Sequence, residues 1–237
     1  MALPSIWYNK NRKGMIEIRR ICYIIAACKD YSDDILFTPE KDDIVIAADG
    51  GYNILKDKDI HADILLGDFD SIQELPDHNN IIRHPVQKDD TDTFLAYKLG
   101  WEKGYRNFII FGGVGGRIDH TYANIQTLLN IAKNGGRAFL IGDNTIMTTI
   151  YNSKLIFSDD FSGNISIFAQ GGIARNVTIN GLKYCADSIN LLPDIPLGVS
   201  NESIGARSEI SVNNGALLIV WNETVQSFLK NIGDFVI

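Results

Sequence analysis

Cysteine is scarce in this sequence. Only Cys22, Cys28 and Cys185 occur among 237 residues, and they form no CxxC pair. This number and spacing exclude a disulfide-stapled secreted fold and a zinc site built on paired cysteines. We therefore expect reduced thiols, packed as small hydrophobic side chains, in a cytoplasmic protein.

Long apolar runs are also missing, since no stretch approaches the roughly 20 apolar residues of a membrane-spanning helix. The run Ile21–Ala27 follows Arg19-Arg20 and superficially resembles the core of a signal sequence. It is short for that purpose and begins far into the chain. Because β-branched residues fill it and Lys29-Asp30 closes it, we interpret it as a buried strand.

Positive charge is in deficit, with 22 basic against 29 acidic residues and a net charge of −7. This balance argues against nucleic acid and anionic membrane surfaces as partners. It suits a protein whose acidic clusters hold a metal ion or a cationic ligand. The hydrophobic content of 45% allows the core of one large domain or two small ones.

Residues 16–142 alternate short apolar runs with helical patterns. The expected helices are Thr93–Lys103 and Ile118–Lys133, and Gly135-Gly136 ends the second. We expect its buried face to carry Ile118, Tyr122, Ile125, Leu128, Leu129 and Ala132. The expected strands are Ile21–Ala27, Ile44–Ala48, Ile64–Leu66, Ile81–Arg83, Phe108–Phe111 and Ala138–Ile141. This alternation predicts a Rossmann-like α/β fold, with a mainly parallel sheet and helices on both faces.

Beyond Asn144 the pattern predicts short strands separated by turns, with no long amphipathic helix. The expected strands are Ile165–Phe168, Val177–Ile179, Ser188–Leu192, Glu209–Val212 and Ala216–Trp221. Asn180-Gly181 and Asn214-Gly215 are strong hairpin signals. We predict a smaller all-β sandwich or barrel. The predicted division is a flexible arm at 1–15, an α/β domain at 16–145 and a β-domain at 146–237.

Acidic residues follow two of the predicted strands. Asp49-Gly50 comes after Ile44–Ala48, while Asp68 and Asp70 come after Ile64–Leu66. In extended backbone, carboxylates two positions apart point to one side and repel unless a cation lies between them. Such hard oxygen ligands suit Mg²⁺. The alternative is that each Asp stabilises a turn or caps a helix.

A third acidic cluster, Lys88-Asp89-Asp90-Thr91-Asp92, opens a predicted helix. Asp90 or Thr91 could simply cap that helix. A cap uses one side chain, however, whereas three acids lie within four positions, and Lys88 could meet a phosphate.

Four glycines occur in Gly112–Gly116, between a predicted strand and a helix. Glycines let backbone N–H groups approach a phosphate at a helix amino end. The run does not match the GxGxxG dinucleotide fingerprint, and the chain has no GxxxxGK[ST] loop. Arg117 could clamp a transferring phosphate. His120 could contact a phosphate, orient a neighbour or cap the helix.

Taken together, these segments resemble the thiamine pyrophosphokinase family, in a form similar to its bacterial members. The resemblance rests on the four clusters above and on Gly181-Leu182-Lys183-Tyr184 and Gly198-Val199-Ser200-Asn201-Glu202, all in the family's order. It implies an α/β catalytic domain, a β-rich thiamine-binding domain, and a homodimer with active sites at the subunit interface. It implies Mg²⁺, with ATP as co-substrate, thiamine as acceptor, and AMP and thiamine diphosphate as products.

The resemblance also implies residue roles. Catalytic positions would be Asp68, Asp70, Asp92 and Asp119, and the first three would bind the metal. Contacts to ATP and its phosphates would come from Asp49, Gly50, Lys88, Asp89, Gly113, Gly115, Gly116, Arg117 and His120. Ser200 and Asn201 would lie near thiamine. We expect no nucleic-acid or membrane partner.

Three alternatives stay open at this point. A dinucleotide-dependent oxidoreductase could use the same sheet, although the broken glycine fingerprint argues against it. A non-catalytic nucleotide- or thiamine-binding module would not obviously need the full set of acids. Another Mg²⁺-dependent phosphoryl or nucleotidyl transferase would share the metal–phosphate chemistry.

Overall fold

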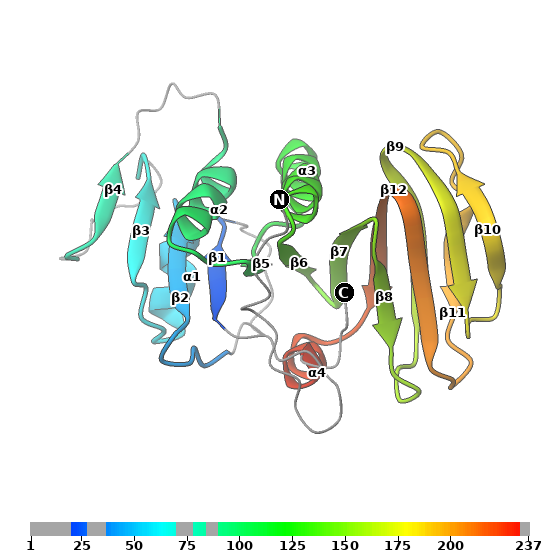
Figure 1. The fold of residues 1–237 in the computed structure, drawn as a ribbon. Coiled ribbons are helices and arrows are strands. Elements are labelled where there is room, and N and C mark those ends of the chain that lie inside the picture. The colour runs from blue at the N-terminus through cyan, green and yellow to red at the C-terminus, as the bar shows by residue number, and fades with distance from the viewer. Residues whose placement is uncertain (1–19, 28–36, 70–77, 84–89, 233–237) are drawn as a thin grey trace.

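Six parallel strands form one half of a continuous sheet (Figure 1). The computed structural model describes residues 20–27, 37–69, 78–83 and 90–232. The strands are β1 (Ile21–Ile25), β2 (Ile44–Ala48), β3 (Ile64–Gly67), β4 (Ile81–Arg83), β5 (Asn107–Phe111) and β6 (Arg137–Gly142). Their order is β6-β5-β1-β2-β3-β4. All six predicted strands are confirmed, with bounds that differ by two residues at most.

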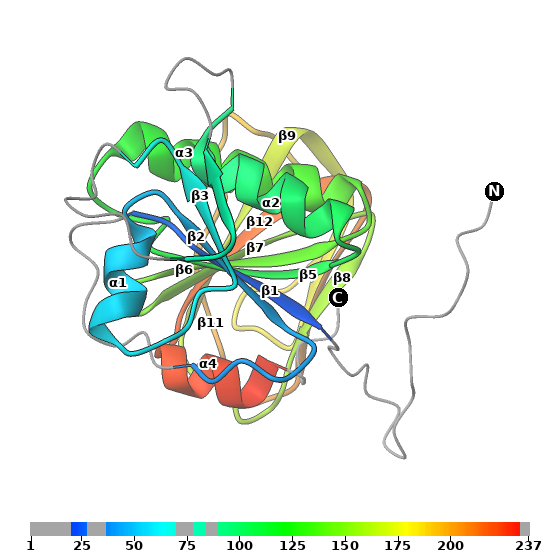
Figure 2. The same ribbon diagram turned by 90° about the vertical axis from the view of Figure 1, so that its left-hand side faces the viewer.

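Helices cover both faces of these strands, which explains their continuous apolar sequences (Figure 2). The helices are α1 (Gly51–Asp57), α2 (Asp92–Glu102), α3 (Ile118–Lys133) and α4 (Val225–Asn231). Alternate residues of β1 enter different cores: Tyr23 packs in the core that contains Leu55 of α1 and Phe228 of α4. Ile24 packs in the other core, beneath α2 and α3. Within the described residues, no helix is long and apolar enough to span a membrane.

The cysteines follow the prediction only in part. Cys22 is fully buried in β1, and burial, with smaller effects from Asp43 and Asp63, raises the pKa of its thiol. The expectation of a thiol packed as a small hydrophobic side chain is confirmed there. It is wrong for Cys185, whose side chain is exposed and donates to the carbonyl of Leu182 at 3.2 Å. Cys28 lies outside the described residues.

The sheet continues into an antiparallel half without a break. β7 (Thr145–Tyr151) pairs antiparallel with β6, and the path runs on through β12 (Ser208–Asn222), β9 (Asn164–Asn180) and β10 (Ala186–Leu191). Two shorter strands pair at its sides: β8 (Lys154–Phe157) with β12, and β11 (Gly198–Glu202) with β9. The turn between β6 and β7 coincides with the predicted change of character after Asn144.

Two strands here are much longer than predicted. β9 joins the predicted strands Ile165–Phe168 and Val177–Ile179, while β12 joins Glu209–Val212 and Ala216–Trp221. The hairpin predicted at Asn214-Gly215 is therefore wrong. The ladder between β9 and β12 shifts register at this point, and a Cβ on Gly215 would lie 2.7 Å from the carbonyl oxygen of Ile173. The glycine allows two strands to stay paired through a bulge.

The buried face of α3 also differs from the prediction. Ile118 and Tyr122 are 78% and 63% exposed. Asn124 and Thr127 are buried instead, with Leu128 and Ile131. These four positions share a helical face, so the helical period is confirmed, while the apolar residues of the first turns lie outside it. Both polar residues bond to backbone: Asn124 to the glycine loop, as described below, and Thr127 by donating its hydroxyl to the carbonyl of Ala123 at 3.0 Å.

An aromatic cluster joins the two halves of the protein. Phe139 of β6 contacts Phe228 of α4 with ring centroids 4.9 Å apart. Trp221 at the end of β12 contacts Phe139 at 6.3 Å and Phe157 of β8 at 5.3 Å. All four rings are at most 2% exposed and lie within one core that extends from α1 into the antiparallel strands. The two halves therefore share a core as well as a sheet.

Replacing Phe228 with Ala should destabilise both halves together. The change removes a ring from the shared core, and such truncations cost about 3–5 kcal/mol. We expect the urea midpoint to fall in one cooperative transition, followed by tryptophan fluorescence and by circular dichroism. Tyr122→Ala, which removes an exposed ring, should leave the midpoint nearly unchanged. Two separate transitions in wild type or variant would contradict a shared core.

Candidate active site

The carboxyl ends of β2 and β3 bring Asp49 and Asp68 to the same edge of the sheet. The backbone N–H of Asp49 donates to the carbonyl of Leu66 at 2.7 Å. A Cβ on Gly67 would lie 3.0 Å from the Cα of Asp49, so the two strand ends approach as closely as glycine permits. Both carboxylates are partly buried. This edge is where parallel α/β sheets bind ligands.

Asp68 is held between two fixed neighbours. Gly67 packs against Asp49, and Phe69 is 5% exposed, inserted in the core on the α1 face. Phe69 has φ 62° and Asp49 has φ 49°. The left-handed conformation is strained for a bulky residue, and such strain occurs where burial of the side chain compensates for it. The local backbone is thus determined by packing.

This geometry corrects one step of the sequence argument. Asp68 and Asp70 were expected to share a side because the chain between them was taken as extended. Phe69 is not extended, so that argument for a shared side is wrong. Asp70 itself lies outside the described residues, as do Lys88 and Asp89. Their predicted roles stay predictions.

The glycine-rich segment follows β5, beside β1. Strand order reverses between these two strands, and the backbone N–H of Ala26 after β1 donates to the carbonyl of Phe111 at 2.8 Å. Gly112, Gly115 and Gly116 have φ values of 63°, 97° and 58°. Each would be strained with a side chain, so the loop depends on glycine. A loop at such a switch point suits a nucleotide.

Two polar residues of α3, which the sequence analysis missed, hold this loop in place. Asn124 is 4% exposed and donates from Nδ2 to the carbonyl of Gly113 at 2.8 Å. The hydroxyl of Thr121 accepts from the N–H of Gly115 at 3.2 Å. The available signal was that Asn124 is a polar residue on the same helical face as Leu128 and Ile131. The loop is thereby held by side-chain bonds before any ligand binds.

Arg117 and Asp119 form an exposed ion pair at the start of α3. The guanidinium contacts both carboxylate oxygens, with Nε 3.2 Å and Nη2 2.5 Å from them. The hydrogen bond from Arg117 lowers the pKa of Asp119, with a smaller contribution from His120. Arg117 occupies the N-cap position without a capping side-chain bond, so His120 is not the cap. The pair leaves Arg117, Asp119 and His120 at the surface beside the glycine loop.

The start of α2 shows which residue of the third acidic cluster caps the helix. Thr91 is the N-cap, and its Oγ1 accepts from the N–H of Phe94 at 3.2 Å. Asp90 instead pairs with Lys98 at 2.6 Å. Asp92 stands in the first turn, half-buried, and is not needed as a cap. Of the two caps considered, Thr91 is confirmed.

The described acids do not by themselves form a compact metal cage. Within residues 20–27, 37–69, 78–83 and 90–232, no three His, Cys, Asp or Glu side chains are grouped closely enough to hold a metal ion. Mg²⁺ commonly takes only one or two protein carboxylates, with water and substrate phosphates as its other ligands. The oxygens of Asp49, Asp68 and Asp92 match that chemistry.

The two residues predicted near thiamine lie at the other end of the sheet (Figure 1). Ser200 and Asn201 belong to β11, which pairs with β9. Ser200 is exposed and left-handed, with φ 58°, whereas Asn201 is 5% exposed. They are not close to the carboxyl ends of β2 and β3 within this chain.

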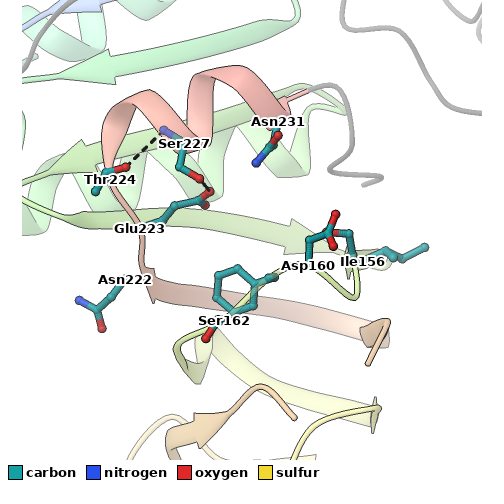
Figure 3. A pocket seen from close by; sticks show the side chains of 10 residues that line it. Ile156, Asp160, Ser162, Asn222, Glu223, Thr224, Ser227 and Asn231 are labelled. Carbon is teal, nitrogen blue, oxygen red and sulfur yellow. Dashed lines mark hydrogen bonds between the residues drawn. The ribbon is translucent and has the colours of Figure 1, made fainter. Parts of the chain in front are cut away.

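A cleft of about 380 Å³ opens between the end of β8 and the start of α4 (Figure 3). None of the predicted site residues lines it. Its Glu223 accepts from Nε1 of Trp221 at 2.9 Å and from the hydroxyl of Ser227 at 2.7 Å. Those bonds fix the end of β12 to α4, so we assign this cleft a structural role. The lining residues are Ile156, Ser158, Asp160, Phe161, Ser162, Asn222, Glu223, Thr224, Ser227 and Asn231.

Comparison with known proteins shows which family the chain is similar to. Residues 38–140 match the family model described as thiamin pyrophosphokinase, catalytic domain. The thiamine pyrophosphokinase of Bacillus subtilis is 28% identical over 211 residues, which cover 86% of this chain and 98% of that protein. The chain is thus similar to thiamine pyrophosphokinases over most of its length, and residues 38–140 resemble their catalytic domain.

Solved structures show the same similarity over both halves of the chain. The crystal structure of thiamine pyrophosphokinase from Bacillus subtilis superposes with a TM-score of 0.78 at 26% identity, covering 87% of this chain and all of that one. The enzyme of Candida albicans, with a TM-score of 0.68 at 18% identity and coverage of 86% and 89%, shares the fold. The family's mixed α/β fold with one large sheet is therefore confirmed for this protein. The family-model match over residues 38–140 includes β2, β3, α2, the glycine loop and α3.

Removing the guanidinium at position 117 should raise the pKa of Asp119. In the native protein the Arg117 hydrogen bond holds this pKa low, so the favourable contact is present above the unfolded-state pKa and is lost as pH falls through the lower folded value. In Arg117→Gln we expect the carboxyl carbon of Asp119 to titrate at higher pH, measured by NMR. Arg175→Gln, a distant exposed change, is the control. An unchanged titration midpoint in Arg117→Gln would show that the pair does not persist in solution.

Proposed function

We propose that this protein transfers the pyrophosphoryl group of ATP to the hydroxyl of thiamine, giving thiamine diphosphate and AMP. The observation that carries the proposal is the match of residues 38–140 to the family's catalytic domain, over the elements that present Asp49, Asp68, Asp92 and the glycine loop. The hydroxyl oxygen would attack the β-phosphorus of ATP in line, the bond to the α-phosphate would break, and AMP would leave.

The chain's own residues would act by positioning and by charge. Phosphoryl-type transfer needs aligned reactants and neutralised charge more than covalent help from the protein. The N–H groups of the glycine loop, held by Asn124 and Thr121, would receive phosphate oxygens. Arg117 would exchange Asp119 for a phosphate, since both are exposed. We assign Asp92 to orient the hydroxyl of thiamine and accept its proton.

Mg²⁺ fits the donor set described above. Asp68 and Asp92, with Asp70, would hold it, because carboxylate oxygens are its preferred protein ligands. Bound there, the ion would neutralise negative charge on the phosphate oxygens. Asp49 and Gly50 would contribute to the ATP site at the end of β2, and Lys88 and Asp89 would approach it from the segment before α2. His120 would contact a phosphate from the first turn of α3.

The acidic edge also suits the acceptor. Thiamine carries a thiazolium cation, which a strongly basic kinase site would repel and which this carboxylate-rich edge attracts. We propose a division of labour with a Rossmann-like α/β unit at 16–145 for ATP, a β-sandwich unit at 146–237 for thiamine, and an arm at 1–15. The cytoplasmic location stays a prediction.

A second copy of the chain would complete each active site. β2 and β11 are separated by seven strand-to-strand steps in the sheet. At about 4.8 Å a step this separation is roughly 30 Å, although reacting atoms must come within bonding distance. We therefore propose a homodimer in which Ser200 of one subunit faces the carboxyl ends of β2 and β3 of the other. Closed two-fold pairing is the commonest arrangement of identical subunits.

The products distinguish this function from its rivals. Incubation with ATP, Mg²⁺ and thiamine should yield AMP and thiamine diphosphate in equal amounts, separated by anion-exchange chromatography. Omitting thiamine should abolish AMP formation. Production of ADP would mean that a single phosphoryl group moves and would contradict the pyrophosphoryl assignment, whereas binding without products would favour a non-catalytic module.

Mixing two defective variants tests the shared site. Asp68→Asn removes a proposed metal ligand, and Ser200→Arg places a cation where the thiazolium would bind, so each alone should lose turnover by orders of magnitude. Heterodimers would hold one intact site, so refolding an equal mixture should recover about a quarter of wild-type activity. As a control, Asp68→Asn refolded with Asp68→Asn should stay inactive. No recovery from the mixture, with dimers present by sedimentation, would place both residues in the same chain's site.

A further inference from the structure

Two hydrogen bonds in series connect the antiparallel strands to the middle of α3. The hydroxyl of Thr149 in β7 donates to Oε1 of Gln170 in β9 at 2.7 Å, and Nε2 of Gln170 donates to the backbone carbonyl of Ile125 at 2.9 Å. Both strands pair with β12, so the bond between these two side chains crosses one intervening strand. Thr149 is 3% exposed and Gln170 is half-buried. The oxygen and the nitrogen of the Gln170 amide therefore each have a partner within the protein.

The bond to Ile125 is directional, unlike the apolar contacts that α3 makes with the sheet. The helix packs on β6 and β7, and its Leu128 and Ile131 lie in the core beneath it. Apolar burial has no preferred direction, so it fixes the position of a helix along its axis less strictly than a hydrogen bond does. A carbonyl within a helix accepts from the N–H four residues later and has a second lone pair for another donor. Gln170 therefore fixes the backbone of α3 without interrupting the helix.

The same part of α3 holds the glycine loop. Asn124, which precedes Ile125, donates to the carbonyl of Gly113 at 2.8 Å. One turn earlier, the hydroxyl of Thr121 accepts from the N–H of Gly115 at 3.2 Å. The helix is thus bonded to the loop through two side chains and to the antiparallel half through Gln170. A shift of the helix at Ile125 would be transmitted to the loop by these bonds.

We propose that Gln170 is a positioning residue for the nucleotide, which sets through α3 where the glycine loop lies. This inference rests on the nucleotide side of the proposed function, because it takes the loop to bind the phosphates of ATP. It deepens that function by placing one determinant of ATP affinity in the antiparallel half, outside the α/β unit. Gln170 acts through the helix and not by contact with ATP.

Gln170→Glu separates the two bonds in the series. The introduced carboxylate can still accept from Thr149 but cannot donate to the carbonyl of Ile125. The dissociation constant of MgATP is measured by calorimetry without thiamine, and the KM for thiamine is measured at saturating MgATP. We expect the dissociation constant to rise about fivefold, the size of one lost hydrogen bond, with the KM for thiamine unchanged. Amide hydrogen exchange at Gly115 should become faster, because α3 no longer holds Thr121 firmly against it.

Matched variants in β7 test the same series from its other end. Thr149→Val removes the hydroxyl that orients the Gln170 amide and should weaken MgATP binding, whereas Thr149→Ser keeps a hydroxyl and should retain wild-type affinity. Thr148→Val is the control, since it removes a different buried bond, from the Thr148 hydroxyl to the carbonyl of Ala138 at 2.7 Å. It should lower the urea midpoint and leave the affinity for MgATP unchanged. The Thr149 pair also decides the question if Gln170→Glu does not fold.

A purely structural role would give a different result. Gln170→Glu or Thr149→Val with a lower urea midpoint but wild-type affinity for MgATP would overturn the inference, because the bonds would then only stabilise the fold. Equal losses for MgATP and thiamine would also overturn it, since a general loosening of the protein would explain them.

Failure of the proposed function is a separate outcome. Wild-type protein that binds MgATP but forms no AMP and thiamine diphosphate would contradict the proposed transfer, and the MgATP affinities of the variants would still decide the inference. Wild-type protein without affinity for MgATP would overturn both.

Discussion

The continuity of sheet and core across the β6–β7 turn is the constraint on which the rest of this structure depends. β7 pairs with β6 in the sheet. The rings of Phe139, Trp221 and Phe228 pack together on one face of the sheet where the two halves meet. The parallel and antiparallel halves are therefore held in one orientation. Because the carboxyl ends of β2 and β3 and the outer strand β11 are fixed far apart, the two regions proposed to bind ATP and thiamine cannot meet within one chain.

The proposed nucleotide side of the site is shaped by backbone conformations that buried neighbours impose. Phe69 in the core and the close contact of Gly67 with Asp49 fix the chain around Asp68. Asn124 and Thr121 do the same for the glycine loop from α3. The charged groups themselves, such as Arg117 and Asp119, stay near the surface. Rigid surroundings with exposed charges are a suitable arrangement for a reaction that needs alignment and neutralisation.

The sequence predicted the parallel half well, because strands buried on both faces leave apolar runs that few other structures produce. The bounds of α3 were predicted correctly, although its buried face was not. Asn124 lies inside because the glycine loop offers it a carbonyl, a contact that only the folded chain creates. Ile118 is exposed in turn. Helical periodicity identified the element, and tertiary hydrogen bonds decided which side faces the core.

Prediction of the antiparallel half failed where turn-forming residues lie inside strands. Gly171-Gly172 and Asn214-Gly215 are composed like turns, but β9 and β12 continue through them with a register shift. Local composition cannot distinguish a reversal from a bulge, since both need backbone freedom. The site residues show a similar limit. The role predicted for Ser200 and Asn201 near thiamine stays a prediction, and only the fold shows that Ser200 faces outward and Asn201 inward.

The corner of β9 links the antiparallel half to α3, beside the proposed nucleotide site. Gln170 donates from Nε2 to the carbonyl of Ile125 in the middle of α3, and a Cβ on Gly171 would lie 2.8 Å from Cδ2 of Leu129. The antiparallel half thus packs against α3 and supports the helix whose N-cap is Arg117. A longer side chain or an inserted residue at this corner would tilt that helix away and so move Arg117, which we propose to bind phosphate, although the corner itself lies outside the proposed phosphate site.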